Sequence, residues 1–359
     1  MKHIFLSLLV MMAATATAQK MQTVDKAGQP VPYASILHEN GDIVGTTDIN
    51  GVIKDVKGAK TVSITHVAYQ PKQVTVTDGA VITLDDGEFG LPEITVTKKP
   101  LVYAQTYYRI LYFSDSEEYP MYYYRTGVVN NSFDRKEKKL SLDEDHYSVA
   151  NKGLFKTLLN VFIGGYIERM ASLKMNKVED RMKKKYPELN IAFTPDGPGK
   201  QLITDKYGKI GIVTDNHDKG ERRYSYEAHE LSKHHINEVG SDKKKAKAEK
   251  REEREKNREE QSFIVYRIDE DGNYVPEDFV MQQVLESYDD TKRNGHTTIL
   301  IQYFTTDRAY VTKDELKERK KANKMKMTFQ NMKDFERTHN IPPLPEALQK
   351  RIEELANKD

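Results

Sequence analysis

Apolar and polar positions alternate over short runs in the first quarter of the chain. Residues 62–67 read Val-Ser-Ile-Thr-His-Val, which has the two-residue period of a half-buried strand. Turn sequences at 40–42 (Asn-Gly-Asp) and 48–51 (Asp-Ile-Asn-Gly) separate other runs, because Asn and Gly adopt positive φ at low steric cost. About seven short strands with such turns between them predict a small β-sandwich.

The rest of the chain mixes longer strand patterns with helical ones. Apolar residues recur every three or four positions over 154–185, which predicts a helix that Gly164 and Gly165 break or bend. Thr312 and Glu315 have the spacing of a capping box at the start of further helices. The predicted class is α+β: an N-terminal small antiparallel β-sandwich followed by a larger antiparallel-sheet-plus-helices region.

This pattern divides the chain into successive parts. We expect a signal peptide over 1–18, the sandwich over 19–98, an α+β domain over 100–310 with a charged insertion at 242–261, and C-terminal helices over 311–359. The insertion carries nine Lys/Arg and seven Asp/Glu. A solvated helix with i,i+4 ion pairs or a mobile segment accounts for that composition, and either can project toward a partner.

The first residues indicate export. Lys2 precedes an apolar run over 4–14, and Ala16-Thr17-Ala18 supplies small residues at the cleavage positions. No later segment reaches the roughly 18 apolar residues of a membrane-spanning helix, so we expect no transmembrane span. The expected location is the periplasm or the periplasmic face of the outer membrane.

Composition excludes several classes of protein. The 56 Lys+Arg and 55 Asp+Glu leave a net charge of +1, which argues against a globally basic nucleic-acid-binding protein. The chain has no Cys, so disulfides, thiolate zinc sites, Cys nucleophiles and a Cys-linked lipid anchor are excluded.

Four short sequence motifs of the first domain occur in the order in which one protein family has them. They are Val24-Asp25 with Gly28 and Pro-Val-Pro-Tyr-Ala-Ser-Ile at 30–36, Gly-Thr-Thr-Asp-Ile-Asn-Gly at 45–51, Ser-Ile-Thr-His-Val-Ala-Tyr at 63–69, and Leu-Pro-Glu-Ile-Thr-Val at 91–96. The segment resembles the carboxypeptidase regulatory-like family, apart from Ala68 and Ile53, where that family usually has Gly and Phe. The resemblance implies a transthyretin-like β-sandwich, a carbohydrate-binding-like fold, that serves as an accessory module without catalytic residues.

Two groups of residues are candidates for binding. Tyr122, Tyr123 and Tyr124 suggest a ligand platform, because aromatic faces stack on apolar ligand faces, although Tyr also suits any half-buried strand.

The weak candidates for a metal are His229, His234, His235 and Glu238. His234 lies five residues after His229, whereas zincins need four, and His235-Ile-Asn-Glu238 matches only a short element of zinc carboxypeptidases. The sequence therefore assigns no catalytic residue, no metal site and no cofactor.

Three functions fit these patterns. The first is an exported, non-enzymatic binding or adaptor protein of the bacterial cell envelope, with an envelope protein as partner, no nucleic acid and peripheral contact with the outer membrane. The alternatives are a periplasmic carrier of an apolar ligand in an open half-barrel and a metal-dependent hydrolase. A packed core would favour the adaptor, and an apolar cavity would favour the carrier. A cleft that joins His235, Glu238 and a third His would favour the hydrolase.

Overall fold

A computed structural model describes most of the chain after residue 19. The described ranges are 20–53, 56, 58–90, 99–114, 121–134, 139–151, single positions within 153–160, 178–216, 220–239, 258–268, 274–289 and 295–357. The predicted signal peptide and most of the predicted 154–185 helix lie outside them. The charged insertion does too, except that its last residues, 258–261, begin a strand.

One large antiparallel sheet organises the fold. Its ten strands have the order β10-β9-β8-β17-β16-β15-β14-β13-β12-β11. Their bounds are β8 Leu101–Ser114, β9 Met121–Asp134, β10 Lys139–Ala150, β11 Ala192–Pro195, β12 Lys200–Asp205, β13 Gly208–Asn216, β14 Glu221–Glu227, β15 Arg258–Ile268, β16 Tyr274–Asp289 and β17 Gly295–Val311. The last strand, β17, pairs with the first, β8, and so joins two runs of hairpins into one sheet.

The predicted α+β class is wrong, because strands account for 51% of the chain and helices for 23%. The prediction underestimated the strand content because the strands of the large sheet are long. β16 and β17 have 16 and 17 residues, and β8 and β9 have 14 each. The central strands are buried on both faces, as β8 is along nearly its whole length, and such strands lose the two-residue alternation that marks a strand.

The N-terminal part folds into two small sheets. Strands β4-β1-β7 form one, and strands β3-β2-β5-β6 form the other. The strands are β1 Met21–Val24, β2 Ser35–Leu37, β3 Ile43–Thr46, β4 Val52–Ile53, β5 Thr61–His66, β6 Tyr69–Thr75 and β7 Val81–Thr83. β1 and β7 pair in parallel, so this sandwich is not wholly antiparallel as expected.

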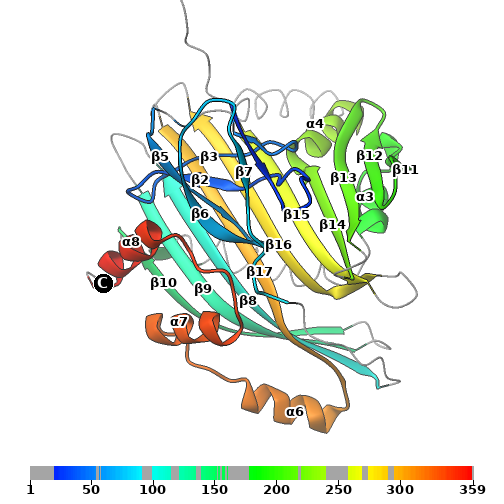
Figure 1. Cartoon of the computed structure of the whole chain (residues 1–359). Coiled ribbons are helices and arrows are strands. Elements are labelled where there is room, and N and C mark those ends of the chain that lie inside the picture. The colour runs from blue at the N-terminus through cyan, green and yellow to red at the C-terminus, as the bar shows by residue number, and fades with distance from the viewer. Residues whose placement is uncertain are drawn as a thin grey trace, which may run out of the picture.

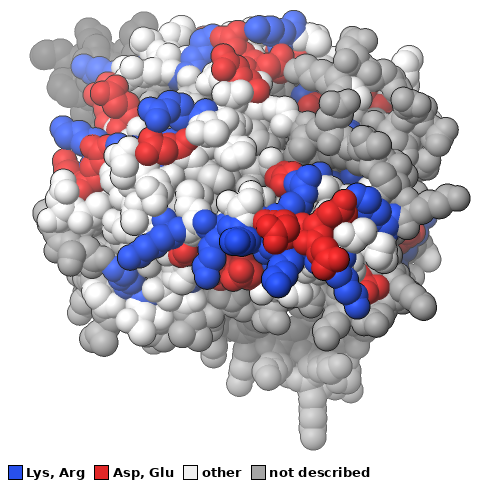
Figure 2. Space-filling view, turned by 90° about the horizontal axis from the view of Figure 1, so that it is seen from below, with Lys and Arg blue, Asp and Glu red and all other residues white. Residues whose placement is uncertain are grey.

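The helices of the described ranges lie on the large sheet or at its ends. They are α3 Val178–Lys185, η1 Pro187–Leu189, α4 Ala228–Val239, α6 Lys313–Ala322, α7 Phe329–Thr338 and α8 Glu346–Ala356. The sandwich, α7 and α8 cover one face of the large sheet, while α3 and α4 lie at its β11–β14 end (Figure 1). α6 lies below the sheet in Figure 1 and so on the face seen in Figure 2.

A continuous chain of buried hydrogen bonds joins the sandwich to the large sheet. Gln282 of β16 donates through Nε2 to the Tyr33 carbonyl at 2.7 Å. Its Oε1 accepts from the Val67 N–H at 3.0 Å and from Gln302 Nε2 at 2.6 Å. The Oε1 of Gln302 in turn accepts from Arg109 Nε at 2.5 Å. Both Gln side chains are fully buried, so each depends on these partners.

Arg109 extends this chain to the C-terminal segment. Its Nη2 donates to the Pro342 carbonyl at 2.8 Å, and its Nη1 lies 3.2 Å from Oε1 of Glu336 on α7. Tyr107 donates to the same oxygen at 2.6 Å. Arg109 is only 2% exposed, so its charge is stabilised by these partners and not by water. The sandwich, the sheet and the C-terminal segment therefore share one polar network, called the buried polar chain below.

We expect Gln282→Leu to lower the free energy of unfolding by about 3 kcal/mol, because it leaves a buried carbonyl, a buried N–H and the Gln302 amide without partners. Gln73→Leu on the exposed surface of β6 is the matched control and should change stability by less than about 0.5 kcal/mol. Urea unfolding of both variants measures the difference. Equal effects from the two variants would contradict the role of the buried polar chain.

Candidate functional site

The Tyr platform suggested by the sequence is not formed, because two of its three rings are in the core. Tyr123 and Tyr124 are 0% and 1% exposed and point to opposite faces of β9. Tyr123 donates to Asn160 Oδ1 at 2.6 Å, and the Tyr124 hydroxyl lies 3.1 Å from the Met332 sulfur of α7. The three residues alternate along a strand that is covered on both faces, which the sequence pattern could not reveal.

Tyr122 has a structural partner as well. Its hydroxyl donates to Asp42 Oδ1 at 2.6 Å, in the turn between β2 and β3. The Arg351 guanidinium of α8 lies 3.7 Å from the centre of its ring and also pairs with Asp42. Tyr122 thus fastens the sandwich and α8 to the edge of the large sheet.

The His residues of α4 bind carboxylates from neighbouring elements. His234 Nδ1 lies 2.5 Å from Asp205 Oδ2 at the end of β12. His235 Nδ1 bonds to Glu188 of η1, and this bond is the main cause that lowers the pKa of Glu188. The two imidazoles therefore have different carboxylate partners and do not converge on one position.

Glu238 is engaged too, by the Tyr207 hydroxyl and the Lys206 ammonium of the β12–β13 turn. His229 lies in the first turn of the same helix. Within the described ranges, no three His, Asp or Glu side chains come together in a geometry that could hold a metal ion. Three of the four candidates, His234, His235 and Glu238, instead anchor α4 to η1 and to the β12–β13 turn.

His66 is a buried titratable group where β5 of the sandwich meets β15. Its ring lies edge-on to Phe263 with the centroids 4.4 Å apart. Its Nδ1 accepts a hydrogen bond from the Ala68 N–H at 3.2 Å, so that nitrogen carries no proton. Burial first, and then the nearby charge of Arg223, lower the pKa of His66 to about 3. The imidazole is therefore neutral in the folded protein near neutral pH.

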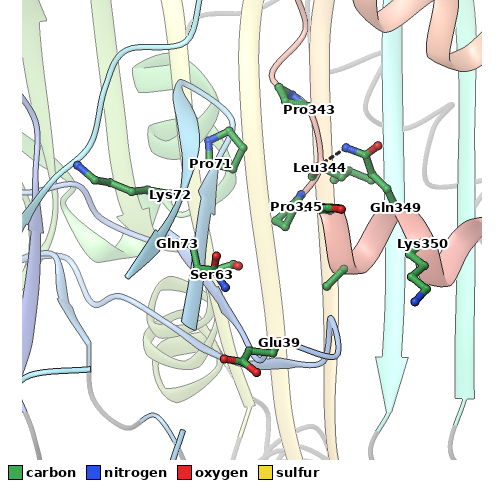
Figure 3. A pocket seen from close by; sticks show the side chains of 12 residues that line it. Glu39, Ser63, Pro71, Lys72, Gln73, Pro343, Leu344, Pro345, Gln349 and Lys350 are labelled. Atoms are coloured by element: carbon green, nitrogen blue, oxygen red, sulfur yellow. Dashed lines mark hydrogen bonds between the residues drawn. The ribbon is translucent and has the colours of Figure 1, made fainter. Parts of the chain in front are cut away.

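An open space lies between the sandwich and the C-terminal segment. This interdomain cleft has a volume of about 550 Å³. One wall is the outer face of β5 and β6, with Ser63 opposite Gln73 in the strand register and Pro71 beside them. The other wall is the segment 343–350, and Figure 3 shows Pro71 and Gln73 turned toward Pro345.

Polar side chains around the interdomain cleft have no partner within the described part of the chain. They are Glu39, Ser63, Gln73, Glu346 and Lys350. Lys72, on the opposite face of β6, is by contrast bonded to the Thr83 carbonyl. Gln349 donates to the Leu344 carbonyl at 2.5 Å and holds the far wall in shape (Figure 3). The cleft thus presents two walls of mixed apolar and polar character, with polar side chains at their rims that are open to a ligand.

Sequence reasoning missed this cleft. Its walls are about 270 residues apart in the chain, and only the folded sheet brings them together. The one signal in the sequence is the run Ile-Pro-Pro-Leu-Pro at 341–345, whose prolines favour a rigid extended backbone. Its Pro residues form part of the wall.

A second, smaller space lies between the sandwich and strands β14 to β16 of the large sheet. It has a volume of about 280 Å³, and Glu221 and Arg223 are the charged residues of its otherwise apolar lining. These two residues pair with each other at 3.1 Å, and Arg223 also donates to the Tyr69 hydroxyl at 2.8 Å. The charges in this space therefore already have partners.

Comparison with known proteins gives no family. The chain matches no protein-family model, and no curated protein is similar to it. One similar solved structure is titled "Lipid-protein interactions in lipovitellin" and has 8% identity with this chain and a TM-score of 0.28. The match covers 60% of this chain, which spans 26% of that one. A similarity this weak carries no argument about fold or function. No described helix has the length and apolar character needed to cross a membrane.

We expect the neutral state of His66 to make stability depend on pH. Below the ordinary pKa of 6.5 the unfolded chain binds a proton that the folded chain, with its pKa of about 3, does not. Stability from this group is therefore complete above about pH 6.5 and is lost as the pH falls toward 3, by up to about 1.4 kcal/mol per pH unit.

Urea unfolding near pH 7 and near pH 4.5 tests this expectation, with His66→Leu beside the unchanged protein. The variant should lose less stability between the two pH values, because it has no imidazole to protonate on unfolding. The same loss in both proteins would show that His66 does not contribute to the pH dependence.

Proposed function

We propose that the protein is an exported, non-enzymatic binding protein of the bacterial cell envelope that acts as an adaptor. In this proposal the interdomain cleft holds an extended segment of an envelope protein. The observation that carries it is the cleft itself, with polar side chains at its rim that bond to no other described residue: Glu39, Ser63, Gln73, Glu346 and Lys350. The periplasm, or the periplasmic face of the outer membrane, is its proposed location, in line with the predicted signal peptide.

The chemistry of the cleft favours an extended peptide. A peptide backbone offers donors and acceptors in alternation, and the rim of the cleft supplies both an amide and a hydroxyl. Pro71, Pro343 and Pro345 contribute rigid apolar surface, which loses little entropy on binding. Glu39, Glu346 and Lys350 provide charges of both signs, so a partner segment with both signs fits better than a uniformly charged one.

The packing of the large sheet supports the adaptor more than the other functions weighed above. Described side chains on both faces belong to packed cores, around Tyr107 and Phe304 on one face and around Tyr108 and Tyr303 on the other. A carrier needs apolar side chains that face a cavity. A metallohydrolase needs converging ligands, whereas His235 and Glu238 bond to different neighbours.

The resemblance of the first domain agrees with an accessory role. Carboxypeptidase regulatory-like domains are accessory modules, and we propose that this sandwich belongs to that family. Its strand β6 supplies one wall of the cleft, so the module takes part in binding and does not act as a spacer alone.

A photo-crosslinking residue placed at Gln73 or at Lys350 tests the proposal in the living cell. These positions lie on opposite walls of the cleft, so both should crosslink to one segment of the same envelope protein, identified by mass spectrometry of the product. The same crosslinker at Lys184, on the exposed end of α3, is the matched control and should not give that product.

A substitution that fills the cleft provides a second test of the proposed binding site. Ser63→Arg should reduce crosslinking from Lys350 at least about tenfold, because a bulky side chain replaces a small one in the wall. Products that differ between the two walls, or that survive this substitution unchanged, would contradict the proposed site.

A further inference from the structure

α6 is a helix with no buried residue, yet it is held firmly to the protein. Thr312 and Glu315 form a capping box at its start. Glu315 also pairs with Lys99 at 2.6 Å, and this bond together with the Thr312 backbone lowers the pKa of Glu315 to about 2. Arg319 pairs with Asp307 of β17 at 2.6 Å. These contacts fix one side of the helix to the end of the large sheet.

Lysines gather on another side of the same helix. Lys313, Lys317, Lys320 and Lys321 have the spacing i, i+4, i+7 and i+8, which places them on one face of an α-helix. This face differs from the one that carries Glu315 and Arg319. Lys313, Lys317 and Lys321 are exposed and Lys320 is half-buried.

The basic stripe continues beyond the helix. Lys324 and Lys326 are exposed and flank the half-buried Met325, while Met327 is buried. The alternation turns both lysines outward from the segment that leads to α7. We call Lys313, Lys317, Lys320, Lys321, Lys324 and Lys326 the lysine stripe. Figure 2, which views the side on which α6 lies, shows Lys and Arg in a band across this face with Asp and Glu among them.

The charges of the lysine stripe are not neutralised within the described part of the protein. None of its six lysines forms an ion pair there, although the acidic neighbours Glu315 and Asp307 do so with other residues. Asp314 and Glu318 are the remaining acidic residues of α6 and lie to one side of the stripe. The stripe is therefore a local concentration of positive charge on a protein with a net charge of only +1.

We infer that the lysine stripe binds the phosphate headgroups of an anionic membrane surface. Lysines are flexible point charges, and the planar guanidinium of Arg319 on the same helix is already paired with Asp307. A row of such charges matches a surface on which anionic phosphates are mobile and can gather under each ammonium. Clusters of four to eight Lys/Arg on a helix are the usual pattern of this recognition. The inference goes beyond the proposed adaptor role, because the interdomain cleft can hold a partner without a membrane.

Binding to vesicles tests the lysine stripe. The probes are vesicles of phosphatidylethanolamine with phosphatidylglycerol, and neutral phosphatidylcholine vesicles serve as reference. The protein should sediment with the anionic vesicles at low salt and dissociate at about 0.5 M NaCl, where screening is strong. Each lysine near such a surface is worth about a fivefold change in partition coefficient. Lys317→Gln/Lys321→Gln/Lys324→Gln should therefore reduce partitioning about 100-fold at low salt.

The control variant removes the same charge elsewhere. Lys183→Gln/Lys184→Gln/Lys185→Gln acts on the exposed end of α3 and should change partitioning by less than about threefold. Comparing variants of one chain also cancels any contribution from the N-terminal segment. Equal losses from both triple variants, or no preference for anionic over neutral vesicles, would overturn the inference. Crosslinking from the cleft would be unaffected by that result, so the two proposals fail separately.

Discussion

The buried hydrogen bonds of Gln282, Gln302 and Arg109 are the constraint on which the rest of the structure depends. Each of these side chains is almost fully buried, so any part of the network that separates leaves polar groups without water or partner. Gln282 holds two backbone groups of the sandwich, and Arg109 holds the Pro342 carbonyl and Glu336. Apolar packing supplies most of the attraction between these parts, but the polar groups specify a single arrangement.

That arrangement determines the interdomain cleft. Arg109 binds the carbonyl of Pro342, directly before the wall residues Pro343 to Lys350. Gln282 binds the Val67 N–H, at the end of the strand β5 that carries Ser63. Both walls are therefore held by the central strands of the large sheet, and the pair between Arg351 of α8 and Asp42 of the sandwich joins the two sides beside the cleft. A site built in this way is preorganised, which lowers the entropic cost of holding an extended segment.

The sequence predicted local features well and the large sheet poorly. The capping box of Thr312 and Glu315 is present, since it depends only on residues three apart. The sequence pattern did not predict the full length of β16 and β17, because strands buried on both faces lack alternation. No local signal indicates that β17 pairs with β8. Tyr123 and Tyr124 were predicted to form a ligand platform because the sequence does not show that both faces of β9 are covered. The cleft could not be predicted at all, since its walls meet only through tertiary structure.

The distance between the two cleft walls tests this account most directly. Because the chain contains no Cys, spin labels attached to Gln73→Cys and Lys350→Cys are the only ones in the molecule. Pulsed electron resonance should give one narrow distance distribution across the cleft. Arg109→Met, in protein that remains folded, should broaden that distribution, because the Pro342 carbonyl loses its partner. A broad distribution in the unchanged protein, or an unaltered narrow one in the variant, would contradict the claim that the buried polar chain sets the cleft.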